Sequence, residues 1–259
     1  MPELPDVEVF RDVLEEHGLE RRIETVHLPS DSVLEDVSKS TLRRRLKGHR
    51  LVSTRRHGKH LFAGIDGGGW LRFHFGMTGY LASWEGDEDG PEHAKLILDF
   101  PGGRHLGYVC VRRLGVIGIV DDAEAFVEEK GLGPDARDLD LDGLRQRLEG
   151  RSGSIKGTLM NQGVVAGLGN IYVDEILYQS GVDPRARADG LPDDAARSIH
   201  RTTGRVLERA IDGGVEDFPR AWLIRRREAG ADCGRCEGTI EKTEVSGRST
   251  YFCPRHQRK

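Results

Sequence analysis

Long apolar stretches are absent from this sequence of 259 residues. A helix that spans a membrane needs about 20 consecutive apolar residues, and no run of that kind occurs. The first residues, Pro2, Glu3 and Asp6 among them, do not form the basic and then apolar pattern of a secretory signal. These two absences predict a protein of the cytoplasm that has no contact with membranes.

Cysteine is scarce as well, because the chain has only four. Cys110 stands alone in a stretch that we interpret as a core strand, where it is expected to pack as a small apolar residue. The other three, Cys233, Cys236 and Cys253, are crowded into the last 27 residues. This uneven distribution favours a metal site over a framework of disulfides.

A surplus of positive charge is also absent, since the formal net charge is −4. This value argues only weakly against nucleic acid as a partner, because phosphate binding depends on where lysines and arginines lie. Acidic residues gather at 85–89 and 135–142, in stretches that we expect to be exposed. Any one basic cluster could be a solvated face, but several together favour a DNA-binding channel. The basic clusters are 43–47, 55–59, 112–113 and 225–227.

The order of apolar residues predicts an α+β protein. A short amphipathic helix follows Pro5 and ends at Gly18, and residues 23–120 carry short apolar runs broken by glycines, which indicate an antiparallel β-sandwich. Residues 155–180 and 195–211 have helical spacing. The expected strands are 60–65, 70–75, 96–100 and 116–120.

The stretch 131–150 is rich in glycine and aspartate, and we interpret it as a domain junction. The chain should therefore divide into a β-sandwich domain at 1–133, a helical domain at 134–230 and a metal hairpin at 231–259. The hairpin is too short for a core of its own and would need a metal to fold.

Two pairs of metal-ligating residues enclose sixteen residues near the end of the chain. Cys233 and Cys236 form the first pair, and Cys253 and His256 form the second. Each pair fits on one tight turn, and a hairpin would bring the pairs together as a tetrahedral zinc site. The alternative is a surface histidine beside three reduced thiols. We predict one structural Zn²⁺ per chain, because four protein ligands leave no open position for catalysis.

Two turns suit phosphate binding. Arg248 is expected at the tip of the metal hairpin, where its planar guanidinium contacts a phosphate or only water. In the segment 155–178, two helical stretches are separated by Val165-Ala-Gly-Leu-Gly-Asn170. Such a turn can aim backbone N–H groups and a helix dipole at one phosphate, although glycine-rich turns between helices are common.

As a string, this segment closely resembles the helix-two-turn-helix motif of the formamidopyrimidine-DNA glycosylase and endonuclease VIII family. The resemblance covers nearly the whole chain, and its six motifs stand in the family's order. Beside the helical motif and the zinc hairpin they are Pro2-Glu-Leu-Pro-Asp-Val-Glu8, Arg55-Arg-His-Gly-Lys59, His74-Phe-Gly-Met-Thr-Gly79 and Arg112-Arg-Leu-Gly115. The resemblance implies a base excision repair glycosylase and lyase that acts as a monomer on damaged double-stranded DNA of the nucleoid.

By the same resemblance, Pro2 is the nucleophile once removal of Met1 exposes its secondary amine. An α-amino group titrates near pH 8, so an appreciable neutral fraction exists at physiological pH. Attack on the sugar C1′ gives a cationic Schiff base, an electron sink that allows β and then δ elimination of the phosphates. Glu3 would serve as general acid and base. The alternative for these residues is a simple helix-start signal.

Other residues match positions at which the family contacts DNA. Lys59 would hold the phosphate near the lesion, unless it is only a lysine that snorkels at a strand end. His74 and Asn170 match further DNA contacts. The residues that would fill the gap left by a flipped base are Met77, Arg112 and Leu114.

Three departures from the formamidopyrimidine branch leave the preferred lesion open. Leu114 replaces a typical phenylalanine, and Asp6 replaces a glutamate. Only residues 217–232 separate the helical domain from Cys233, where the purine-specific branch has a longer loop. The opening Pro-Glu-Leu-Pro favours the formamidopyrimidine branch, whereas the short connection resembles endonuclease VIII, which prefers oxidised pyrimidines.

Two other classes of function compete with this interpretation. A non-catalytic damage-binding protein would not need Pro2, Glu3 and Lys59, all of which are present. A zinc-bearing RNA- or ribosome-associated module would not explain the N-terminal motif. Both alternatives are therefore less favoured than the repair enzyme.

Overall fold

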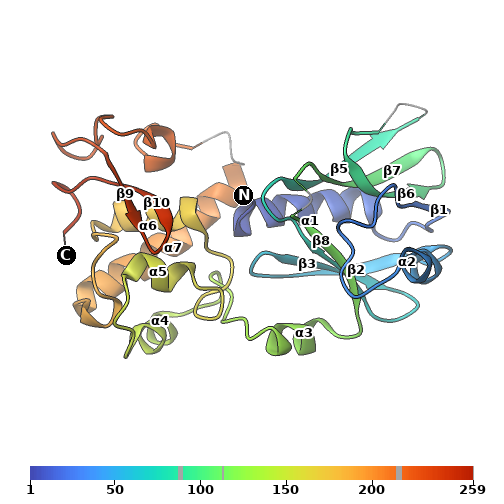
Figure 1. The fold of residues 1–259 in the computed structure, drawn as a ribbon, viewed down its shortest axis with the longest axis horizontal. Coiled ribbons are helices and arrows are strands. Elements are labelled where there is room, and N and C mark those ends of the chain that lie inside the picture. Colours follow the sequence, from blue (N-terminus) through green and yellow to red (C-terminus); the bar gives the residue numbers. More distant parts are fainter. Residues whose placement is uncertain (87–89, 113, 214–217, 259) are drawn as a thin grey trace. The chain divides into compact units, whose positions relative to one another are not determined.

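The computed structural model describes residues 1–86, 90–112, 114–213 and 218–258. Two compact units, Met1–Lys130 and Gly131–Lys259, make up the chain (Figure 1). The three-part division expected at residues 133 and 230 stays a prediction. Three predicted features lie partly outside the described residues. They are residues 87–89 of the acidic stretch 85–89, Arg113 of the third basic cluster and Asp217 of the connection before Cys233. Within the described ranges, no helix is long and apolar enough to cross a membrane.

Two antiparallel four-stranded sheets form the first unit and confirm the predicted β-sandwich (Figure 1). Apolar side chains from both sheets share one core cluster, to which Leu61, Phe73, Leu98 and Tyr108 belong. In spatial order, one sheet consists of β1 (Thr25–His27), β6 (Ala94–Phe100), β7 (Arg104–Cys110) and β5 (Gly79–Glu85). The other consists of β2 (Leu51–His57), β3 (His60–Ile65), β4 (Trp70–His74) and β8 (Val116–Val120).

Helix α1 (Leu4–Gly18) packs against strands of both sheets. Its apolar stripe of Leu4, Val7 and Leu14 is fully buried, and the ring of Phe10 lies 4.5 Å from that of Phe75. This burial anchors the helix, and with it the first residues of the chain, on the sandwich. Two shorter helices complete the unit, α2 (Lys39–Leu46) and α3 (Ala123–Glu129).

The second unit is helical and ends in a two-stranded hairpin. The helices are α4 (Leu141–Leu148), α5 (Ile155–Met160), α6 (Asn170–Ser180) and α7 (Asp193–Gly213), with single 3₁₀ turns at Ala188–Gly190 and Leu223–Arg226. The hairpin consists of β9 (Glu241–Val245) and β10 (Arg248–Phe252). Helix α6 is almost wholly buried and contacts α5, α7 and β10.

The break between the two helices of the central motif comes earlier than the sequence predicted, because α5 already ends at Met160. The side chain of Asn161 accepts a hydrogen bond from the Gly163 N–H at 2.9 Å. The side chain of Gln162 spans the turn, donating to the Met160 and Leu168 carbonyls at 2.9 and 2.8 Å. Such local bonds from side chain to backbone compete with the helix and end it.

The boundary between the two units falls at the start of the stretch 131–150, as the sequence predicted, but the stretch itself is ordered structure of the second unit. It contains α4, and the carboxylate of Asp140 caps that helix by accepting from the Gly143 N–H at 2.7 Å. Asp135 was expected to be exposed, but it is buried and accepts from the Arg137 N–H at 3.1 Å. These aspartates accept hydrogen bonds from backbone N–H groups in a turn and at a helix cap. A stretch rich in aspartate looks exposed in the sequence, so this role could not be recognised there.

Candidate functional site

The start of α1 fixes the residues around the predicted nucleophile. Glu3 is the N-cap residue of this helix and is buried. Its backbone N–H donates to Asp6 Oδ2 at 2.7 Å, and its own side chain accepts from the Asp6 N–H, so the two residues form a capping box. Pro5 lies in the first turn, where its fixed φ suits a helix start. Pro2 is thereby held next to an ordered carboxylate.

Asp6 connects the N-terminus with Lys59. The positive N-terminus and the Lys59 ammonium both lower the pKa of the Asp6 carboxyl, although burial is the larger effect and leaves that pKa raised. Electrostatic effects of this kind need short separations. We infer from these effects that the first residues and Lys59 lie near one another. Asp6, which the sequence singled out only as a departure from the family, belongs to the same group.

Lys59 lies in the two-residue turn between β2 and β3, where His57 pairs with His60. Gly58 occupies the first turn position with φ of 56°, as a tight hairpin of this class requires. Arg56 fixes the turn to the helix, since it donates to Glu8 Oε1 of α1 at 2.8 Å and to the Gly58 carbonyl at 3.1 Å. Both charged side chains are buried, so Arg56 sets the position of Lys59 relative to α1.

His74 ends β4 and is held as a neutral imidazole. Its Nδ1 accepts from the Gly76 N–H at 3.3 Å, which leaves the proton on Nε2. Burial, aided by Arg72 and Lys59, lowers its pKa to about 4. The ring of His60 lies 4.9 Å away, and burial lowers the pKa of His60 to about 2. His74 can therefore offer a phosphate a neutral N–H donor rather than a cation.

The three residues predicted to fill the gap of a flipped base come from two neighbouring loops. Met77 and Leu114 are 41% and 55% exposed, and Arg112 Nη1 lies 3.9 Å from Met77 Sδ. The Arg112 N–H also donates to Thr78 Oγ1 at 3.1 Å. The loops touch at Gly76, where a Cβ would come within 2.3 Å of the Leu114 carbonyl oxygen. Two exposed apolar tips and one arginine thus stand together.

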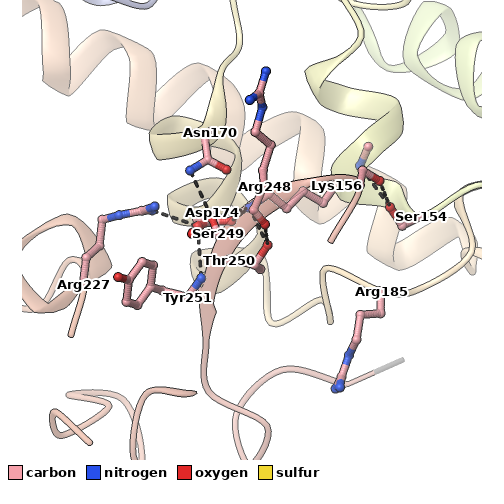
Figure 2. Close-up of polar contacts among 12 residues, drawn as sticks. Ser154, Lys156, Asn170, Asp174, Arg185, Arg227, Arg248, Ser249, Thr250 and Tyr251 are labelled. Atoms are coloured by element: carbon pink, nitrogen blue, oxygen red, sulfur yellow. Dashed lines mark hydrogen bonds and ion pairs between the residues drawn. The ribbon is translucent and has the colours of Figure 1, made fainter. Parts of the chain in front are cut away.

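In the second unit, the predicted phosphate-contacting residues lie beside each other (Figure 2). Asn170 is the first residue of α6, and its Nδ2 donates to the Ser249 carbonyl of β10 at 3.1 Å. Arg248 follows the tight turn of Ser246 and Gly247, both with positive φ, so it begins β10 directly after the hairpin tip. One carbonyl therefore joins the start of α6 to the strand that carries Arg248.

A buried group of charges, which the sequence analysis missed, fixes this junction (Figure 2). Lys156 Nζ lies 2.7 Å from Asp174 Oδ1 and also donates to Thr250 Oγ1 at 2.7 Å. Arg227 Nη1 donates to Asp174 Oδ2 at 2.8 Å, and the Tyr251 N–H donates to the same oxygen at 3.2 Å. Residues from α5, α6, β10 and the segment before the hairpin meet here, so Arg248 and Asn170 keep one relative position.

The thiols of Cys233, Cys236 and Cys253 form one cluster in which the sulfur atoms lie within 4.8 Å of one another. Cys236 Sγ and Cys253 Sγ are 3.6 Å apart, close to the edge of about 3.8 Å for a tetrahedron with Zn–S distances of 2.3 Å. The Gly238 N–H donates to Cys236 Sγ at 3.3 Å. These residues fit one structural zinc ion, which would tie the two ends of the hairpin together.

His256 stands beside this cluster but is not part of it among the described residues. Its Nε2 lies 2.9 Å from the Tyr178 carbonyl oxygen, which can accept the Nε2 proton. A histidine that ligates zinc usually donates its other ring N–H to such a carbonyl, and the lone pair of Nδ1 then remains for the metal. The tautomer therefore suits a ligand, and the role of His256 as the fourth ligand stays a prediction.

Three profiles of known protein families match successive parts of the chain. The profile described as the formamidopyrimidine-DNA glycosylase N-terminal domain matches residues 1–117, and that of the H2TH domain of the same enzyme matches residues 131–218. A zinc finger found in FPG and IleRS matches residues 232–255. Together the three profiles cover most of the chain without overlapping.

Relatives and solved structures agree with these matches. The formamidopyrimidine-DNA glycosylase of Gluconobacter oxydans is 32% identical, and that of Solibacter usitatus is 31% identical, each over the whole of both chains. A complex between the Lactococcus lactis Fpg and DNA containing an abasic site has a TM-score of 0.90 and 28% identity, and covers 99% of this chain and all of its own. A complex of the same enzyme with N7-benzyl-Fapy-dG DNA has a TM-score of 0.91 at the same identity, with both chains fully covered.

Proposed function

The chain belongs to the formamidopyrimidine-DNA glycosylase family, and from this premise we propose that it removes oxidised bases from duplex DNA through Pro2. It is a base excision repair DNA glycosylase with lyase activity at abasic sites, and its zinc finger holds one structural Zn²⁺. Solved relatives bind DNA that contains an abasic site or a formamidopyrimidine. We propose the same classes of substrate for this protein.

The arrangement of Glu3, Asp6 and Lys59 around the N-terminus carries the proposal for the mechanism. The neutral Pro2 amine attacks C1′ of the damaged nucleotide, and the bond to the base breaks as the base leaves with a proton. Glu3 protonates the opening sugar ring, and the resulting iminium ion draws electrons from C2′. Loss of the C2′ proton then expels the 3′ phosphate, and a second elimination removes the 5′ phosphate.

Residues of the first unit hold the nucleotide during these steps. Lys59 contacts the phosphate beside the lesion, and His74 donates its Nε2 proton to a phosphate oxygen. Met77, Arg112 and Leu114 fill the space that the flipped base leaves, which offsets an unstacking cost of a few kcal/mol. Their exposure and their mutual contact support this role.

The second unit holds the DNA backbone. Arg248 and Asn170 contact phosphates, and the backbone N–H groups at the start of α6 add the positive end of the helix dipole. The zinc ion keeps the hairpin folded and takes no part in the chemistry. The nucleophile, the residues that fill the gap of the flipped base and the DNA-backbone contacts all lie in one chain, so we propose that the protein acts as a monomer. We also propose that it acts on the nucleoid, in the cytoplasm.

The range of lesions should be broad. Residues 218–232 form a short connection that holds the single 3₁₀ turn Leu223–Arg226, and they offer little chain to cover a flipped purine. We propose activity on abasic sites, formamidopyrimidines and oxidised pyrimidines at least comparable with that on 8-oxoguanine opposite cytosine. An endonuclease VIII-like preference for oxidised pyrimidines is the second candidate, favoured by the same short connection.

Borohydride trapping on abasic DNA tests the role of Pro2. Wild-type protein should give a covalent adduct, and Pro2→Gly should give much less. Glu3→Gln should still be trapped on abasic DNA but should fail to excise a damaged base. Pro5→Ala is the matched control, since it changes a nearby proline without altering the amine. Undiminished trapping by a protein with a blocked N-terminus would exclude Pro2, and no trapping at all would favour the non-catalytic damage-binding alternative.

A further inference from the structure

At one end of the first unit, several basic side chains form no ion pair with an acidic residue in the part of the chain that the structure describes. From residue 37 to residue 65 the sequence has nine lysines and arginines and no aspartate or glutamate, although the whole chain has a net charge of −4. Helix α2 and its surroundings hold most of the exposed members of this set. We define the distal basic surface as Arg22, Lys39, Arg43, Arg44 and Lys47.

This surface is remote from the Lys59 turn within the same unit. Strand β2 begins at Leu51, which bridges to Leu19 just after α1, and it ends at His57 beside the turn. Seven residues in a strand span about 20 Å. Arg22 bridges to Arg50 just before β2 begins, so α2 and the distal basic surface lie at the far end of this strand (Figure 1). The basic clusters 43–47 and 55–59 therefore lie at opposite ends of β2.

Part of this charge has a structural explanation. Arg43 Nε donates to the Val26 carbonyl at 3.3 Å, and Arg45 Nη2 donates to the Gly68 carbonyl at 2.6 Å. Basic residues in the last turn of α2 also complement the helix dipole. Arg44 shares this interaction with the dipole, whereas Lys47 lies beyond the helix. Both side chains are exposed, and neither makes a side-chain hydrogen bond or ion pair with any described residue.

One acidic group at this end does not neutralise the surface. The Asp66 N–H donates to the Arg50 carbonyl at 3.0 Å, and the Asp66 carboxylate is occupied by His49 at 2.6 Å. Lys39, Arg43 and Lys47 follow one another at intervals of four residues, where like charges destabilise a helix by some tenths of a kcal/mol per pair. An anionic partner would offset this repulsion.

We propose that the distal basic surface is a second site for the DNA backbone, used in binding undamaged duplex and separate from the lesion site. One helical turn places successive basic residues about 6 Å apart, whereas a duplex presents one phosphate for every 1.7 Å or so of its axis. Each side chain therefore finds a phosphate without any sequence requirement.

The composition of the surface favours DNA over an acidic protein. A protein interface usually has an apolar centre, often aromatic, within a polar rim. The exposed large apolar residues of the described chain are Met1, Val52, Met77, Tyr80, Val111 and Leu114. None belongs to α2, and only Val52 lies at this end of β2. Recognition by charge alone fits a phosphate backbone.

The test compares two double variants of the full-length, zinc-loaded protein on a long undamaged duplex. Arg44→Gln with Lys47→Gln removes two charges, so the slope of log affinity against log salt should fall by about two. The matched control, Arg44→Lys with Lys47→Arg, keeps both charges and should keep the slope. Single-turnover cleavage of a short abasic duplex at saturating protein should be unchanged in both variants.

Each other result would overturn the proposal. An unchanged slope in the neutral variant would show that no phosphate is contacted there. An equal loss in the charge-conserving control would show a change of fold rather than of charge. A loss of cleavage at saturating protein would place these residues in the lesion site. Unchanged affinity for DNA together with loss of binding to an acidic protein would assign the surface to a protein partner.

Discussion

Lys156 and Asp174 form an ion pair, with 2.7 Å between Nζ and Oδ1, in which neither side chain is exposed to solvent. Removing two charges from water is costly, and the pair is tolerated because the remaining hydrogen-bonding groups are also satisfied. Thr250 accepts from the lysine, while Arg227 and the Tyr251 N–H donate to the carboxylate. The pair therefore joins the helical motif to the zinc hairpin.

Loss of one partner of this pair should destabilise the second unit strongly. Lys156→Met should lower the free energy of unfolding by about 3–5 kcal/mol, and Asp174→Leu by more, because it leaves both Lys156 and Arg227 unpaired. The double variant should cost less than the sum of the two. Arg187→Ala is the control, since it breaks an exposed pair worth under about 1 kcal/mol. Additive costs in urea denaturation would contradict the coupling.

The buried histidines should make the protein less stable in acid. The unfolded chain takes up a proton near pH 6.5, whereas burial lowers the pKa of folded His60 to about 2. The unfolded state then binds more protons, so this contribution is complete above pH 6.5 and is lost as the pH falls. At pH 5 the loss is at most about 2 kcal/mol. His60→Phe should flatten the dependence of unfolding free energy on pH; parallel curves would refute this.

Phosphate contact by Arg248 should appear in the salt dependence of binding. Arg248→Ala should weaken binding by similar factors for all sequences and lower the salt slope by about one. Arg248→Lys keeps the charge and should keep the slope. An alanine variant with the wild-type slope would show that the arginine is merely solvated.

The fourth zinc ligand can be identified by substitution of His256. His256→Cys supplies another ligand of the same kind as the three thiols and should retain about one zinc per chain. His256→Ala should lose zinc to a chelator more readily and lose DNA affinity with it, because metal binding and folding are coupled in such hairpins. Full zinc retention by the alanine variant would remove His256 from the site.

Leu114 should make the protein tolerant of the base opposite the lesion. An aliphatic tip offers that base less stacking than an aromatic ring does. Leu114→Phe should therefore increase discrimination among opposite bases, while Leu114→Met serves as a control of similar volume. Single-turnover rates on matched duplexes decide the matter, and a strong wild-type preference for 8-oxoguanine opposite cytosine would contradict both this prediction and the proposed broad range.

Apolar patterning predicted the elements whose own residues are buried. The expected strands at 60–65 and 116–120 coincide with β3 and β8, and the helix that ends at Gly18 coincides with the end of α1. Strand β2 was missed because five polar residues, Ser53 to His57, dominate it. Helix α2 was missed because only Leu42 and Leu46 mark its buried side among charged neighbours.

Linear motifs predicted the site residues better than they predicted the tertiary contacts that position these residues. Pro2, Glu3 and Lys59 stand in recognisable strings, so a resemblance could point to them. The contact of Arg56 with Glu8 joins residues 48 positions apart, and that of Asn170 with Ser249 joins residues 79 apart. Nothing local in the sequence distinguishes such charged or polar residues from solvated ones, because their burial depends on tertiary packing.

The close approach at Gly76 also constrains how this surface can change over evolutionary time. Any side chain at this position would collide with the Leu114 carbonyl, so glycine should persist at position 76 in descendants of this sequence. The contact involves the backbone of Leu114 and leaves its side chain free to vary. Lineages could therefore change the exposed tips by single substitutions, while the approach of the two backbones is inherited unchanged.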